Sequence, residues 1–72
     1  MDKRFNVGAT ATIYGFTYRV AARTAKTVTI ECESHPGMAP HRYRVHADSD
    51  GGEWVKGAGD TCPTHAAEFR AA

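Results

Sequence analysis

The sequence lacks any long apolar stretch and carries little net charge. No segment approaches the roughly 18 consecutive apolar residues of a membrane span, and the opening residues MDKRFNVG are not followed by the apolar core of a signal peptide. We therefore expect a cytoplasmic protein that does not contact a membrane. Nine lysines and arginines against eight aspartates and glutamates leave a formal net charge of +1. This balance argues against a bulk nucleic-acid binder and an acidic nucleic-acid mimic, so a charged partner would have to meet a local patch.

The chain is also short. Its 72 residues permit only one domain, residues 1–72, with a single small core. Domains of this size often add a disulfide, a metal ion or a partner chain to a core that is marginal alone. There are only two cysteines. In a reducing compartment they favour free thiols or metal ligands, while a Cys32–Cys62 disulfide stays open as an alternative.

Apolar and polar residues alternate along Phe16 to Glu33, and this pattern predicts an antiparallel hairpin connected by Thr24-Ala25-Lys26. A three-residue connection sets Tyr18 opposite Cys32 and Val20 opposite Ile30 on the buried face. The same register continues to Ala22 opposite Val28. On the solvated face it sets Arg19 opposite Glu31.

The remaining segments also favour short strands. We expect an edge strand at residues 5–7, a bend at Gly15, and a strand over His41 to Ala47 that pairs with the hairpin. A turn at residues 48–52 then leads into a strand over residues 53–56, in which the only tryptophan, Trp54, is predicted to anchor the core.

From Asp60 onward the composition favours a helical turn, with Pro63 in its first turn and Phe69 as the docking residue. The fold class that follows is mainly β. We expect a small SH3-like barrel of about five antiparallel strands with a short C-terminal helical turn.

Basic residues occupy the positions of the predicted strands that face solvent. The candidate partner-binding residues are Arg19, Arg23, Lys26, Arg42, Arg44 and His46. A nucleic-acid interface is one interpretation, but Tyr18 and Tyr43, which could stack on bases, fall on the opposite parity. The interpretation we favour is a structural ladder in which Glu31 lies between Arg19 and Arg44 and Glu33 lies beside Arg42.

Three segments carry a resemblance to known sequences: Arg23 to Ile30 (RTAKTVTI), Arg42 to Val45 (RYRV) and Gly52 to Val55 (GEWV). In this order they resemble a group of small uncharacterised proteins carried by phages and other mobile elements. The resemblance implies a compact β domain of mobile-element origin and transfers no catalytic residue. The chain departs from that group at Thr61 to His65, where those proteins tend to have a Tyr-Ser-Met-Ala-Pro-like segment.

Two Cys-x-x-His pairs form the sharpest chemical pattern. Cys32 with His35 and Cys62 with His65 have a spacing that lets each loop supply two ligands to a tetrahedral Cys₂His₂ zinc site. Such a zinc ion would tie the C-terminal segment to the end of the central hairpin. The structural alternative is that Cys32 is a small core residue and the histidines are solvated.

An enzymatic interpretation finds little support. Cys62 and His65 could be drawn as nucleophile and base, but no third group orients the histidine, and so small a domain offers little room for a substrate pocket. We predict instead a non-enzymatic protein that binds a host or phage macromolecule, with an inhibitor of a bacterial defence system, such as an anti-CRISPR protein, as the concrete version. The alternative is a nucleic-acid-binding barrel that uses the basic face.

Overall fold

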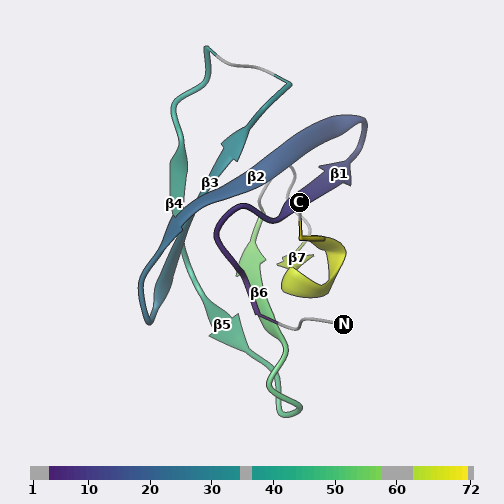
Figure 1. Ribbon diagram of the computed structural model, residues 1–72. Helices are drawn as coiled ribbons and strands as arrows, with labels where there is room; N and C mark the ends of the chain where they lie inside the picture. Colours follow the sequence, from purple (N-terminus) through teal and green to yellow (C-terminus); the bar gives the residue numbers. More distant parts are fainter. Residues whose placement is uncertain (1–3, 35–36, 58–62, 72) are drawn as a thin grey trace.

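The computed structural model describes residues 4–34, 37–57 and 63–71 and consists mainly of β-strands (Figure 1). Two antiparallel sheets are present in this part of the chain. Sheet A has the strand order β1-β2-β3-β4, and sheet B has the order β5-β6-β7. The strands are β1 (Thr10–Ile13), β2 (Phe16–Arg23), β3 (Thr27–Cys32), β4 (His41–Arg44), β5 (His46–Ala47), β6 (Glu53–Lys56) and β7 (Pro63–His65), followed by a 3₁₀ turn, η1 (Ala66–Glu68).

Strands β1 and β2 form a hairpin with a two-residue turn at Tyr14 and Gly15. Ile13 pairs with Phe16, and both turn residues have positive φ angles, 51° for Tyr14 and 80° for Gly15. This is the backbone of a type I′ turn, whose twist matches that of the flanking strands. The expected bend at Gly15 is therefore a complete reversal of the chain.

Tyr14 occupies a turn position that asparagine or glycine adopts with less strain, and its side chain is exposed. We expect Tyr14→Asn to raise the free energy of unfolding by about 0.5–1 kcal/mol, because asparagine tolerates the left-handed conformation. Urea unfolding measures the change. Thr12→Asn, at an exposed position inside β1, is the control and should destabilise slightly; stabilisation by both variants, or by neither, would contradict the turn assignment.

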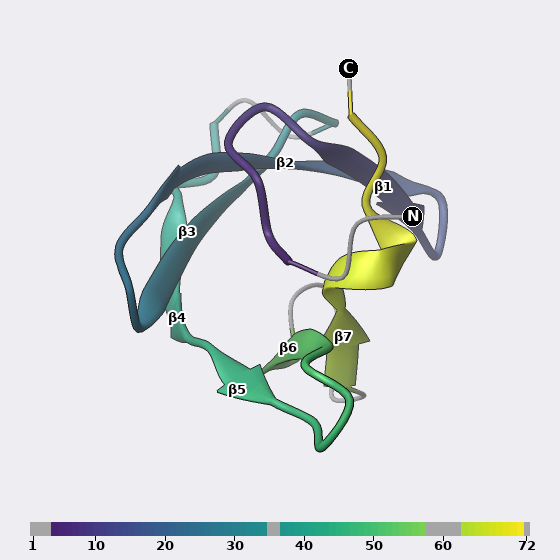
Figure 2. The same ribbon diagram turned by 60° about the horizontal axis from the view of Figure 1, so that its bottom comes forward.

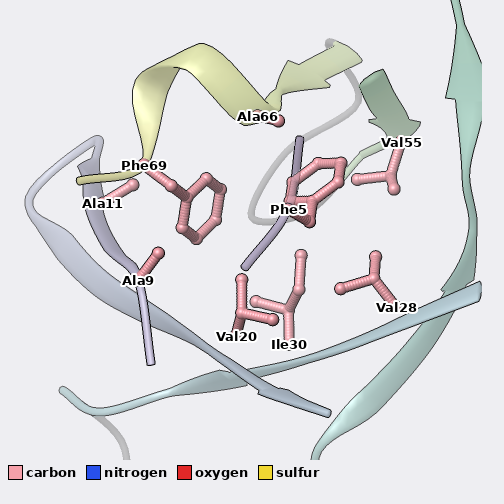
Figure 3. Packing of buried hydrophobic residues seen from close by; sticks show 9 residues of the cluster. All are labelled: Phe5, Ala9, Ala11, Val20, Val28, Ile30, Val55, Ala66 and Phe69. Atoms are coloured by element: carbon pink, nitrogen blue, oxygen red, sulfur yellow. The ribbon is translucent and has the colours of Figure 1, made fainter. Parts of the chain in front are cut away.

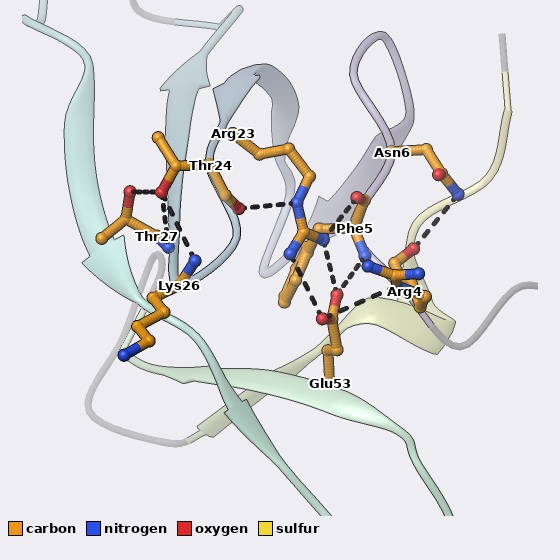
Figure 4. Close-up of polar contacts among 8 residues, drawn as sticks. All are labelled: Arg4, Phe5, Asn6, Arg23, Thr24, Lys26, Thr27 and Glu53. Carbon is orange, nitrogen blue, oxygen red and sulfur yellow. Dashed lines mark hydrogen bonds and ion pairs between the residues drawn. The ribbon is translucent and has the colours of Figure 1, made fainter.

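The central hairpin follows the predicted register for its first part. Tyr18 pairs with Cys32, Arg19 with Glu31 and Val20 with Ile30, and the connection is the predicted Thr24-Ala25-Lys26. The hydroxyl Oγ1 of Thr24 accepts hydrogen bonds from the backbone N–H groups of Lys26 and Thr27, at 3.4 and 3.1 Å, which holds this turn (Figure 4).

Beyond Val20 the predicted register is wrong, because a β-bulge between Val20 and Ala22 inserts one residue into β2. Ala22 then pairs with Thr29, and Arg23 pairs with Val28 instead of lying on the solvated face. Since Val28 is completely buried, the bulge turns the Arg23 side chain toward the interior.

The register of β3 with β4 also differs from the prediction. Arg44 pairs with Thr27 and Arg42 pairs with Thr29, so neither arginine lies opposite a glutamate. On the inner face this register sets Val28 against Tyr43 and Ile30 against His41. The packing of these inward residues outweighs exposed ion pairs, which contribute only about 0–1 kcal/mol each.

Sheet B begins where the chain leaves sheet A at Val45. The predicted turn at residues 48–52 is present, with Gly51 at φ 84° and a 2.8 Å hydrogen bond from the Asp48 N–H to the Gly52 carbonyl. Strand β6 covers the predicted residues 53–56. Figure 2 shows the strands of both sheets and η1 arranged around a common interior.

The C-terminal segment is less helical than predicted. Pro63 begins strand β7 rather than a helix, and only the single turn η1 follows. The chain then returns to β1, where Thr10 and Arg70 exchange two backbone hydrogen bonds of 2.8 and 2.7 Å. No helix in the described ranges is long and apolar enough to cross a membrane.

The core lies between the two sheets and draws on both ends of the chain (Figure 3). Its buried members are Phe5, Ala9, Ala11, Val20, Val28, Ile30, Val55, Ala66 and Phe69. The Phe5 and Phe69 rings meet edge to face with centroids 5.5 Å apart, so Phe69 docks as predicted, whereas Phe5 lies outside any strand. The prediction for Trp54 is wrong, because its neighbour Val55 faces the core and Trp54 is only partly buried.

Candidate functional site

The basic residues predicted to share one face are divided among three environments. Arg19 lies on the outer face of sheet A, defined here as the face turned away from the core, and pairs with two carboxylates. Its Nε donates to Glu31 Oε1 at 2.8 Å and lies 3.4 Å from Glu33 Oε1. The hydrogen bond to Glu31, together with the charges of both glutamates, raises the pKa of Arg19 above its already high value. Arg19 is therefore neutralised, as the ladder interpretation expected.

The bulge turns Arg23 inward, where its side chain forms polar contacts with Phe5 and Glu53 (Figure 4). Its Nη1 donates to Glu53 Oε1 at 2.7 Å and to the Phe5 carbonyl oxygen at 2.8 Å. The Phe5 N–H donates to the same carboxylate at 2.9 Å. This cluster ties the N-terminal segment, β2 and β6 together, and the Arg23 side chain is only 15% exposed.

The contacts of this cluster change the pKa of Glu53. Burial alone would raise it, but the hydrogen bonds from Arg23 and Phe5, with the charges of Arg23 and Arg4, lower the pKa below its ordinary value. Glu53 is therefore ionised at neutral pH, and its role is structural.

Arg42 and Arg44 remain exposed on the outer face of β4, and Lys26 is exposed in the turn beside them. Within the described residues neither arginine has a carboxylate at ion-pair distance, because the observed register places threonines opposite them. The predicted neutralisation by Glu31 and Glu33 is thus wrong for Arg42 and Arg44. We call Lys26, Arg42 and Arg44 the basic edge.

His46 was predicted to lie with these residues but belongs to β5 in the other sheet. Its ring stacks on Trp54 with centroids 4.6 Å apart and planes inclined by 23°. The His65 ring of β7 lies on the same indole, with ring centroids 6.5 Å apart. His46 is thus one member of an aromatic stack and is not part of the basic edge.

The structure describes two of the four predicted zinc ligands. Cys32 is a buried residue of β3 in sheet A, and His65 is an exposed residue of β7 in sheet B. His35 and Cys62 lie outside the described residues. In the part of the chain that is described, no group of three or more His, Cys, Asp or Glu side chains is placed to hold a metal ion. The zinc site therefore stays a prediction.

A second surface, which the sequence pattern did not single out, lies at the end of sheet A farthest from β5 (Figure 1). The β1–β2 turn meets the segment after β3 there, since the Thr17 N–H donates to Ser34 Oγ and the Glu33 N–H donates to the Thr17 carbonyl. Exposed Tyr14 comes from the turn, Phe16 begins β2, and Met38 comes from the connection to β4. We call this surface the aromatic end: Tyr14, Phe16, Tyr18, Met38, His41 and Tyr43.

The aromatic end contains a cavity of about 170 Å³. Tyr18 and Tyr43 line it together with Met38 and His41, and the rings of His41 and Tyr43 lie 5.1 Å apart. Burial raises the pKa of Tyr43, with a further contribution from Tyr18. The alternation of the strands predicted both tyrosines on the inner face, but it did not predict the cavity that they line.

Comparison with protein-family models, with curated proteins and with solved structures finds no match.

Proposed function

We propose that this chain is a non-enzymatic protein-binding module that contacts a host or phage protein through its aromatic end. The exposed aromatic and methionine side chains carry the proposal. In the described residues the exposed large apolar side chains are Val7, Tyr14, Phe16 and Met38, and the last three come from the β1–β2 hairpin and the β3–β4 connection, the two segments that form the aromatic end. Aromatic residues and methionine are enriched at protein interfaces and supply most of their anchors.

The resemblance to phage and mobile-element proteins supports a role of this kind, with inhibition of a bacterial defence system as its concrete form. The strand order supports an SH3-like barrel as the scaffold, because antiparallel neighbours follow one another and a 3₁₀ turn leads back to β1 at Arg70. Peptide-binding barrels of that class use aromatic-lined grooves.

The test is capture of proteins from a bacterial lysate by the immobilised chain, compared with two variants. Phe16→Ser combined with Met38→Ser should reduce the specifically retained protein by about tenfold or more, because two interface anchors are removed. Val7→Ser is the control, since Val7 is 62% exposed, against 60% for Met38 and 39% for Phe16, but lies beside Phe69 and Ala71, and it should retain the partner. Equal capture by the double variant would overturn the proposal.

A nucleic-acid-binding function is the second candidate, and the unneutralised basic edge is the observation that favours it. It predicts binding to DNA or RNA that falls steeply with salt and weakens in Arg42→Ala and Arg44→Ala. Tyr18 and Tyr43 lie on the inner face of sheet A and Arg42 and Arg44 on the outer face, which separates these stacking side chains from the charges of such a site. This separation is why protein contact is the preferred function.

A further inference from the structure

Strand β4 has an unpaired backbone edge. It is the last strand of sheet A, and no strand in the described residues pairs with its second edge. The Val45 N–H donates to the Lys26 carbonyl at 2.9 Å, so Val45 points its backbone groups toward β3. Because this direction alternates along an antiparallel strand, Tyr43 also points toward β3, and the N–H and C=O groups of Arg42 and Arg44 point outward.

The side chains along this edge specify what can pair with it. Arg42 and Arg44 extend on the outer face, whereas His41 and Tyr43 lie on the inner face beside the cavity of the aromatic end. A strand added in register presents acidic side chains to the two arginines and apolar side chains to His41 and Tyr43. Backbone hydrogen bonds would supply affinity, and the alternating contacts would supply specificity.

Charge decides between the two strands that could occupy this edge. A β4 strand from a second copy would bring arginines opposite arginines, and like charges directly opposite one another are destabilising. The carboxylates of an acidic strand would instead form ion pairs with Arg42 and Arg44. These two arginines have no carboxylate partner among the described residues.

We propose that β4 pairs with an extended segment of a partner protein in which acidic and apolar residues alternate, and that this segment becomes an added strand of sheet A. The inference rests on the protein-binding function proposed above and names the partner's chemistry. The apolar residues of the segment extend the contact from the edge onto the aromatic end.

The first experiment uses two fluorescein-labelled peptides of identical composition and charge, EVEVEVE and EEEEVVV, in anisotropy titrations with the full chain. The alternating peptide should bind about tenfold more tightly, because the grouped peptide cannot pair both faces at once. Equal affinities would show attraction to positive charge alone and would overturn the proposal. Tighter binding of a single-stranded oligonucleotide than of the alternating peptide would also overturn it.

The second experiment follows amide hydrogen exchange by NMR. In the free chain the amides of Arg42 and Arg44 should exchange quickly and those of Tyr43 and Val45 slowly. The alternating peptide should protect Arg42 and Arg44. Protection that appears only elsewhere would contradict strand addition, and this measurement needs no substitution that could impair folding.

Variants at Arg42 separate backbone pairing from charge. Arg42→Ala removes the charge, and Arg42→Pro removes the charge and the outward N–H, which an edge strand tolerates when that N–H faces solvent. Arg42→Pro should bind the alternating peptide about tenfold more weakly than Arg42→Ala, and equal affinities of two folded variants would count against the proposal. If lysate capture depends on Phe16 and Met38 but neither peptide experiment succeeds, the protein-binding function stands and strand addition fails.

Discussion

Phe5→Ala is expected to lower the free energy of unfolding by about 3–5 kcal/mol. The Phe5 side chain is 0% exposed and packs edge to face on Phe69, so its removal leaves a cavity between the two sheets. A chain of 72 residues has a total stability of only about 4–11 kcal/mol, and this variant should be close to unfolding at room temperature. Urea unfolding followed by the fluorescence of Trp54 measures the loss.

Val7→Ala is the control for this substitution, because Val7 is 62% exposed two residues further along the same segment. It should change stability by no more than about 0.5 kcal/mol. A cost below about 1 kcal/mol for Phe5→Ala would contradict the placement of the N-terminal segment in the core.

Arg23→Ala is expected to cost about 2–4 kcal/mol, because it leaves the mostly buried carboxylate of Glu53 without its main partner. Arg19→Ala is the matched control. Arg19 also pairs with glutamates, but its side chain is 47% exposed, so its loss should cost less than about 1 kcal/mol. Similar costs for the two variants would contradict the inward turn of Arg23.

The same ion pair predicts a dependence on pH. The pKa of Glu53 is lower in the folded chain than its ordinary value of 4.5, so its stabilisation is fully present above pH 4.5. The stabilisation is lost as the pH falls through the folded-state pKa. Glu53→Gln should lack this part of the acid-induced loss, which unfolding curves at several pH values would show; an unchanged pH profile would assign the loss to other carboxylates.

The central hairpin was predictable as far as Val20 because alternation and turn length both determine register. The bulge was not, since Ala21 and Ala22 are equally small and neither residue marks an insertion. One inserted residue was enough to move Arg23 from the predicted partner-binding face to the interior. Short-range patterns do not contain this information, because the bulge is stabilised by the contacts of Arg23 with Phe5 and Glu53.

The predicted pairing of β4 is wrong because the packing of the inner residues Val28 and Tyr43 outweighs exposed Glu–Arg pairs. In a four-residue strand such as β6, Trp54 and Val55 are both apolar, so alternation could not show which of them faces the core. The aromatic end was missed for a different reason. Sequence parity assigned Tyr18 and Tyr43 to the inner face, but it did not contain the cavity that they line with Met38 and His41, because that cavity depends on where the connection before β4 lies.

The proposed function is tested most directly by amide hydrogen exchange of the native chain with and without the protein that it captures. Binding through the aromatic end predicts new protection at residues 13–18 and 37–44, with little change in β7 and η1. Protection confined to sheet B, or recovery of nucleic acid in place of any protein, would contradict the proposed function.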